Sequence, residues 1–386
     1  MAEVLFGSEG YIFLAGDNNA AIDQHTGKRS ITKQQLAQWV DTTTAREKYF
    51  NDINIPYYMQ IVPDKHSVYS EYLPVSIIKD SKSNASKVMS VLNPIISEHL
   101  IFAKADLIAA KADEQVYHKI DTHWTDKGAY VGYLQLIECL KEKFPLLSVL
   151  ETPGYNTKWF GGDLGSMQKL KISSEAEMLV EHAGYLEIFN NRVPVTGKVQ
   201  VYENEFADND LVLLIFGGSS TVNFLKFITY SFKKVIFCWS GVLDYKLVEY
   251  YSADVVLNQI RERFLIRPAN DVLGINSSEA AFIKGFSVEP GRKLGLGAQK
   301  YSELFIQCLA KISVKENKVY IKGLKALSHK MGLLPLFYYA ESIDANKVGY
   351  ENAYFDLNSR LDDICAEISK SDLFNIEAVS AAVNKF

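Results

Sequence analysis

The chain has 386 residues, of which 48% are hydrophobic and 23% are charged, and its formal net charge is -5. This balance is typical of a folded globular protein and excludes an intrinsically disordered chain, which has low hydrophobicity and high net charge. No concentrated run of Lys or Arg is present, so we do not expect a nucleic acid as a partner. The length predicts two domains, or one large domain with an appendage.

The start of the chain and its apolar runs bear on location. The first residues, MAEVL, lack the basic stretch and apolar core of a secretory signal. The apolar runs are far shorter than the ~20 residues that a membrane-spanning helix needs. We therefore expect a cytoplasmic protein, or a periplasmic one if an export signal has been removed. The cysteines are too widely spaced for a zinc site and are expected to be buried thiols: Cys139, Cys238, Cys308 and Cys365.

Apolar runs of strand length alternate with amphipathic stretches of helix length through about the first 270 residues. The expected strands are residues 57–62, 211–216, 235–239 and 254–257. The expected helices are residues 32–49, 84–98, 126–143 and 221–232. Because parallel strands need long crossover connections, this alternation predicts a doubly wound α/β fold with a parallel sheet.

The pattern changes after about residue 275. Helical stretches at residues 299–312 and 357–370 dominate, with one short strand-like piece at 318–321. We expect a first domain over residues 1–275 and a mainly helical C-terminal region over residues 276–386. That region is a candidate for docking a partner protein or for self-association.

A glycine-serine turn lies between one expected strand and the helix after it, in the sequence FGGSST at residues 216–221. In an open α/β sheet, ligands bind at the carboxyl ends of the strands. Gly217 and Gly218 allow a tight turn, and a serine there lies beside free helical N–H groups. We expect backbone N–H groups near Gly218 and Ser219 to stabilise an oxyanion. The alternative is that Ser219 or Ser220 only caps the helix.

A second candidate is the segment that contains Asp121 and His123, just before the helix expected to begin at Asp126. A nucleophilic serine needs a base, and an imidazole needs an acceptor on its other nitrogen to fix its tautomer. Asp121 can supply that acceptor. The alternative is a capping loop, with Thr125 as the N-cap and Trp124 as a packing residue.

The sequence DTHWTDKGAY at residues 121–130, followed by the Gly-Gly-Ser-Ser turn, resembles the alginate O-acetylation family, the AlgX and AlgJ type of SGNH hydrolase-like domain. Four further segments resemble this family in the same order, so that the likeness covers about residues 6–265. They are GYIFL at 10–14, VPDK at 62–65, GDLG at 162–165, and ADVV at 253–256 leading to a Glu-Arg pair.

The resemblance implies that Ser219 is the nucleophile, His123 the general base and Asp121 its orienting carboxylate. The order Asp, His, Ser reverses that of ordinary SGNH hydrolases and implies a circularly permuted relative. Two positions depart from the family pattern. Gly218 stands where Asp or Thr is common, and Ser220 stands where an aromatic residue is frequent.

Three further residues are candidates for binding substrate. Lys65 can meet an anionic group, or it is simply a solvated lysine. Asp163 can shape the site through backbone hydrogen bonds, or it serves only a turn. Arg263 can act in the site, or it forms a structural ion pair with Glu262, which is the interpretation that we favour.

The resemblance implies a serine-dependent O-acetyltransferase whose acceptor is a hydroxyl of a bacterial surface polysaccharide or its precursor. It implies no bound cofactor and no metal, with acetyl-CoA as the acetyl donor if the protein is cytoplasmic. Two alternatives stay open: a carbohydrate acetylesterase with the same triad, and a non-catalytic glycan-binding or assembly protein.

Overall fold

The computed structural model describes residues 3–77, 83–167, 172–180, 185–272, 274–284, 287–288 and 290, and the strands Lys318–Ile321 and Tyr338–Glu341. The chain forms two compact units. The first comprises Met1–Ile188, Gln200–Gly241 and Tyr245–Ala269, and the second comprises Phe189–Val199, Val242–Asp244 and Asn270–Phe386. The strand expected at 318–321 is present as β12, which pairs with β13 (Tyr338–Glu341). The helices expected at 299–312 and 357–370 lie outside the described residues.

A seven-stranded sheet with the order β4-β3-β11-β9-β10-β8-β7 forms the centre of the fold. The five strands from β4 to β10 in this order pair in parallel, so the predicted α/β class with a mostly parallel sheet is confirmed. In chain order the strands are β3 (Tyr57–Val62), β4 (Leu100–Phe102), β7 (Tyr185–Asn190), β8 (Val199–Asn204), β9 (Val212–Gly217), β10 (Lys234–Trp239) and β11 (Val255–Arg261).

The long helices are α2 (Lys33–Asp52), α4 (Asn84–Ile96), α6 (Asp126–Lys141) and α8 (Ser219–Ser231). Side chains cap three of them at the N-terminus, as expected for Ser and Thr: Thr32 for α2, Ser83 for α4 and Thr125 for α6. The short helices are α1 (Ala21–His25), α3 (Lys65–Val68), α5 (Lys104–Ala110), α7 (Asp163–Met167), α9 (Tyr245–Tyr250) and α10 (Ser277–Ile283), with 3-10 turns at Ser70–Tyr72, Ser97–His99 and Glu262–Phe264. No helix among the described residues is long and apolar enough to cross a membrane.

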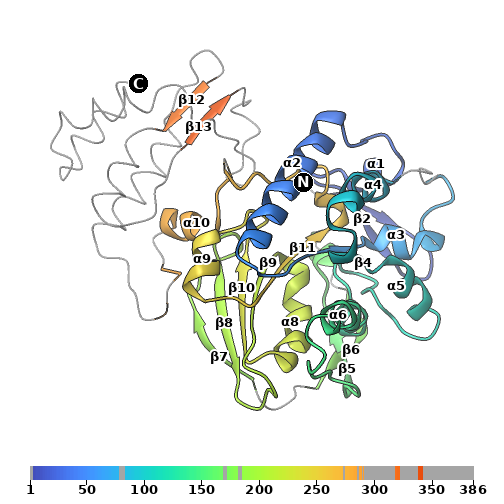
Figure 1. Cartoon of the computed structure of the whole chain (residues 1–386). Coiled ribbons are helices and arrows are strands. Elements are labelled where there is room, and N and C mark those ends of the chain that lie inside the picture. The colour runs from blue at the N-terminus through green and yellow to red at the C-terminus, as the bar shows by residue number, and fades with distance from the viewer. Residues whose placement is uncertain are drawn as a thin grey trace. The chain divides into compact units, whose positions relative to one another are not determined.

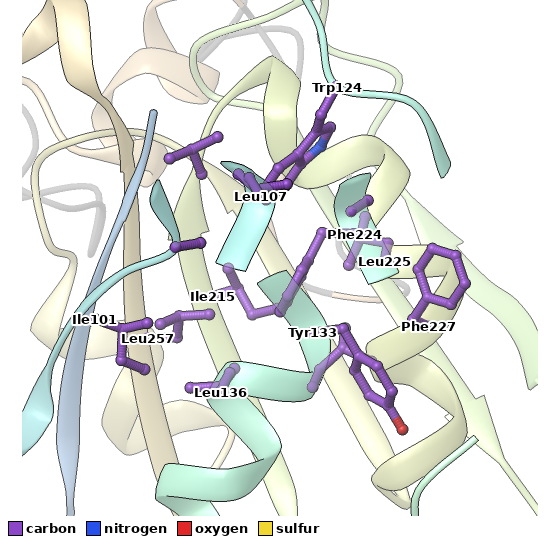
Figure 2. Close-up of a cluster of buried hydrophobic side chains, with 14 of the residues drawn as sticks. Ile101, Leu107, Trp124, Tyr133, Leu136, Ile215, Phe224, Leu225, Phe227 and Leu257 are labelled. Atoms are coloured by element: carbon purple, nitrogen blue, oxygen red, sulfur yellow. The ribbon is translucent and has the colours of Figure 1, made fainter. Parts of the chain in front are cut away.

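The largest apolar core lies between the sheet and helices α6 and α8, which run side by side in Figure 1. Figure 2 shows Ile215 of β9 and Leu257 of β11 among aromatic and aliphatic side chains from the two helices. Burying each such side chain contributes about 1.5–3 kcal/mol to folding. This packing fixes the first residues of α8 relative to the sheet.

The opposite face of the sheet carries a buried polar contact. Arg46 of α2 is fully buried and donates to the side chains of Asn258 (2.9 Å) and Tyr57 (3.1 Å). Two antiparallel pairs were not predicted: β1 (Glu3–Phe6) with β2 (Ile12–Gly16), and β5 (Tyr155–Phe160) with β6 (Ser174–Leu179).

Candidate active site

The predicted site residues follow the carboxyl ends of three neighbouring strands. Ser219 begins α8 directly after β9 and Gly218, Lys65 begins α3 just after β3, and Arg263 follows β11. Because β3, β11 and β9 are parallel neighbours, these ends meet at one edge of the sheet. The loop between α5 and α6, which carries Asp121 and His123, is called the histidine loop. It reaches the same edge through hydrogen bonds to the start of α8.

Asp121 and His123 form the predicted carboxylate–imidazole pair. Asp121 Oδ1 lies 2.6 Å from His123 Nδ1 and also accepts the backbone N–H of His123 (2.8 Å), while Oδ2 accepts the N–H of Asp163 (2.7 Å). Burial alone would raise the pKa of Asp121, but the hydrogen bond and charge of His123 and the two N–H groups outweigh burial and hold the pKa below its usual value. An ionised Asp121 places the proton of the neutral imidazole on Nδ1, which leaves Nε2 free to act as a base.

Two hydrogen bonds connect the histidine loop to the start of α8. Trp124 is fully buried, and its Nε1 donates to the carbonyl of Ser220 (2.9 Å). Asn223 Nδ2 donates to the carbonyl of Trp124 (3.3 Å). Nε2 of His123 has no hydrogen-bond partner among the described residues, so its expected bond to Ser219 is not formed in this structure. The approach of these two groups stays a prediction.

The two adjacent serines differ in exposure. Ser220 is 3% exposed, and its buried hydroxyl has no hydrogen-bond partner in the described part of the chain. Ser219 is partly exposed. A nucleophile must be reachable by its substrate, so this difference favours Ser219, the serine at the family position.

The backbone N–H groups at the start of α8 divide into two kinds. Gly218 N–H donates to Thr221 Oγ1 (3.2 Å). Contrary to the expectation from the sequence, this N–H is therefore not available to an oxyanion. Across the described residues, the N–H groups of Ser219 and Ser220 find no acceptor, as is usual in the first turn of a helix. A Cβ on Gly217 would lie 2.2 Å from Thr221 Oγ1, so this turn requires glycine there.

Lys65 lies inside the protein rather than in solvent. It is 2% exposed, and Nζ donates to the carbonyls of His118 (3.0 Å), Lys119 (3.0 Å) and Asp121 (2.7 Å). An ammonium has three N–H donors, so none remains for an anionic ligand. Burial lowers the pKa of Lys65 to about 7, against the charges of Asp121 and Asp163. In this arrangement Lys65 fixes the loop before His123 and does not bind substrate.

Asp163 makes the backbone contacts that one of its two interpretations required. Its carboxylate accepts from Thr122 N–H (2.8 Å) and Thr122 Oγ1 (2.6 Å), and its own N–H binds Asp121. The preceding Gly162 packs so closely that a Cβ would lie 1.9 Å from the carbonyl of Ile120. The α7 start is therefore docked directly on the histidine loop.

Arg263 has a different partner from the one expected. Its Nη1 lies 2.6 Å from Asp64 Oδ1, whereas Glu262 accepts the backbone N–H of Asp64 (3.0 Å). The expected Glu262–Arg263 pair is thus replaced by an Asp64–Arg263 pair between the ends of β3 and β11. Burial alone would raise the pKa of Asp64, but Arg263 and then Arg261 outweigh it and lower that pKa. Arg263 is 8% exposed, which fits a structural role.

Sequence reasoning missed two residues of the site. Arg261, the last residue of β11, is 3% exposed and donates to the carbonyl of Thr122. Its position at a strand end beside a Glu-Arg pair was the available signal. His118 stacks on Phe160 with ring centroids 4.4 Å apart, and burial lowers its pKa to about 4. His118 had no sequence pattern that distinguished it from other buried residues.

Asp121, His123 and Asp163 offer ligand atoms within 4.8 Å of one another, a grouping that can hold a metal ion. In this structure both oxygens of Asp121 already accept N–H groups, and both oxygens of Asp163 accept from Thr122. His123 Nδ1 is also engaged by Asp121 Oδ1 (2.6 Å), so a metal bound to that nitrogen would have to displace this contact. The arrangement therefore fits an acid–base pair better than a metal centre.

The α/β sheet, the Asp–His pair and the serine at a strand-to-helix turn are the features expected of an SGNH hydrolase-like domain. Residues 4–239 match the family described as "SGNH hydrolase-like domain, acetyltransferase AlgX", and the chain belongs to this family. The predicted family is thus confirmed, and its members are O-acetyltransferases.

Three individual relatives share 29% sequence identity or less with this chain. A "Probable alginate O-acetylase AlgJ" from Pseudomonas syringae pv. tomato is 29% identical over 175 residues, which are 43% of this chain and 42% of that protein, so the match spans less than half of the relative. Bacillus cereus PatB1, solved with a sulfonyl adduct, has a TM-score of 0.50 and 14% identity, covering 69% of this chain and 100% of that chain. The O-acetyltransferase domain of Pseudomonas putida AlgJ has a TM-score of 0.44 and 18% identity, covering 70% of this chain and 94% of that chain.

Proposed function

We propose that this protein is a serine-dependent O-acetyltransferase that moves an acetyl group to a hydroxyl of a bacterial surface polysaccharide or its precursor. Family membership supports the reaction class. The observation that carries the mechanism is the 2.6 Å contact between Asp121 and His123, in a loop bonded to the start of α8. The named AlgJ relative, an alginate O-acetylase, supports a polysaccharide as the class of acceptor.

The proposed reaction has two steps. In the first, Ser219 Oγ attacks the carbonyl carbon of the acetyl donor while His123 Nε2 takes the hydroxyl proton and then passes it to the leaving group. In the second, an acceptor hydroxyl gives its proton to His123 and attacks the acetyl-serine, and His123 passes that proton to Ser219 Oγ as the ester bond breaks, which releases Ser219 and the acetylated sugar. The oxyanion of each step is stabilised by the free N–H groups of Ser219 and Ser220 at the positive end of α8.

Hydrolysis and transfer share the acetyl-serine and differ only in whether water or an alcohol attacks it. A carbohydrate acetylesterase is therefore the alternative with the same residues. The donor in our proposal is acetyl-CoA for a cytoplasmic protein, and an acetyl group handed over by a membrane partner for a periplasmic one. Incubation with the donor and candidate oligosaccharides, with release of acetate compared against acetylated product by mass spectrometry, distinguishes transferase from esterase.

The nucleophile is tested with a matched pair of variants, Ser219→Ala and Ser220→Ala, assayed with p-nitrophenyl acetate. Ser219→Ala should lower kcat on the order of 10³-fold or more and abolish the acetyl-enzyme in the mass spectrum. Ser220→Ala removes a buried hydroxyl without a partner, so both its kcat and its stability should stay close to the parent. Unchanged turnover in Ser219→Ala would show that Ser219 does not carry the measured hydrolysis, which would refute the serine mechanism and favour the alternative of a glycan-binding protein without this activity.

A further inference from the structure

A series of buried hydrogen bonds runs from the turn before α8 into the interior of the first unit. Gly218 N–H donates to Thr221 Oγ1 (3.2 Å), and the Thr221 hydroxyl donates to Gln259 Oε1 (2.8 Å). Gln259 Nε2 then donates to Gln60 Oε1 (2.8 Å), and Gln60 Nε2 donates to the carbonyl of Gly132 (2.8 Å). We refer to Thr221, Gln259 and Gln60 as the polar chain.

The polar chain crosses two strands and joins two helices. Gln60 of β3 and Gln259 of β11 are register partners in the parallel sheet, so their side chains lie on the same face. Thr221 belongs to the first turn of α8, and Gly132 to the middle of α6. Thr221 and Gln60 are 0% exposed and Gln259 is 4% exposed. At such burial each unpaired polar group would cost about 1–3 kcal/mol.

The two ends of the polar chain fix its direction. Gly218 contributes an N–H, which can only donate, and Gly132 contributes a carbonyl, which can only accept. The Thr221 hydroxyl proton must therefore point to Gln259, and both amides must be oriented the same way. Reversing either amide would bring two donors or two acceptors together. Only this arrangement of the hydrogen bonds gives every donor and acceptor of the polar chain a partner.

We propose that Thr221, Gln259 and Gln60 are positioning residues that hold the turn carrying Ser219, an inference that rests on the proposed nucleophilic role of Ser219. The surrounding face of the sheet is apolar, as Ile215 and Leu257 show in Figure 2. Apolar side chains would pack there without the desolvation cost of two glutamines. The polar chain instead keeps Gly218 N–H directed inward, so that only the N–H groups of Ser219 and Ser220 remain available to an oxyanion.

The test compares two threonines of α8. Thr221→Val and Thr229→Val each remove one buried hydroxyl. Thr229 is 1% exposed, and among the described residues its hydroxyl bonds to the carbonyl of Leu225 alone (2.8 Å). For p-nitrophenyl acetate, Thr221→Val should lower kcat by about 10-fold to 100-fold with little change in KM, because small displacements of a nucleophile are costly. Thr229→Val should leave kcat unchanged, and Thr221→Ser should restore it. Equal kcat in the two valine variants would overturn the proposal.

Hydrogen exchange of the Gly218 amide gives a readout that needs no turnover. This amide should exchange at least about 10-fold faster in Thr221→Val than in the parent or in Thr229→Val, since its acceptor is lost. An unchanged exchange rate would refute the positioning role of the polar chain even if Ser219 proves catalytic. If Ser219→Ala retains full turnover while the Gly218 exchange responds as expected, the proposed function fails and the polar chain has a structural role only.

Discussion

The close packing of Gly132 against Trp124 predicts an unusual effect of Gly132→Ala on the free energy of unfolding. In most helix interiors Gly→Ala stabilises a protein by about 1 kcal/mol. Here a Cβ on Gly132, in the middle of α6, would lie 2.9 Å from Cζ3 and 3.0 Å from Cη2 of the fully buried Trp124. Overpacking of this kind costs about 1–3 kcal/mol. We therefore expect Gly132→Ala to lower the free energy of unfolding by up to ~2 kcal/mol instead of raising it.

The cause of this loss can be isolated by a double-mutant cycle with Trp124→Phe, measured by urea unfolding. The two clashing atoms belong to the outer ring of the indole, which phenylalanine lacks. In the Trp124→Phe background, Gly132→Ala should therefore stabilise by about 1 kcal/mol, giving a coupling energy of about 1–3 kcal/mol. If Gly132→Ala already stabilises the parent protein by about 1 kcal/mol, the predicted contact does not restrict Trp124 and the reasoning is wrong.

Two further predictions concern buried charged groups. Lys65→Met should lower the unfolding free energy by about 2–5 kcal/mol in urea titrations. Three buried carbonyls lose their donor, and this loss exceeds the gain from removing the desolvation cost of one ammonium. A stability equal to the parent would contradict the prediction. Burial, against the opposing charge of Asp64, lowers the pKa of His66 from 6.5 to about 4. Between these pH values only the unfolded chain binds the proton, so stability should fall by about 3 kcal/mol as the pH decreases from 7 to 4. His66→Gln, which keeps a donor for the Leu14 carbonyl, should flatten this dependence, and an unchanged slope would exclude His66 as its source.

The four central strands β3, β11, β9 and β10 were predictable because they are buried on both faces, whereas β4, β7 and β8 of the same sheet were not predicted. The run at residues 57–62 is apolar or aromatic except for Gln60, and it forms β3 with the same bounds. The start of α8 was less predictable. The helix begins at Ser219, two residues before the expected start at residue 221, because Gly218 takes the N-cap position that a serine usually fills. The exposed pair β5 and β6 was missed because strands that are mostly solvent-exposed carry little apolar pattern.

In the site, the pairing of Asp121 with His123 was predictable because two residues separated by one position can meet in a loop. The environments of Lys65 and Arg263 were not. Both follow strand ends, where solvent exposure is a reasonable expectation, and both are buried by segments distant in sequence. Their acceptors are loop carbonyls for Lys65 and Asp64 for Arg263, and neither choice follows from local sequence.

The position of β9 in the sheet has a consequence for when reactivity appears during synthesis. His123 and Asp121, the proposed base and its carboxylate, come from one short loop early in the chain. The strand that presents Ser219 lies between β11 and β10, both of which are translated after it. Its turn therefore cannot be held in place until residue 261 has left the ribosome. If the proposed function is right, an unfinished chain would therefore carry His123 without a positioned Ser219.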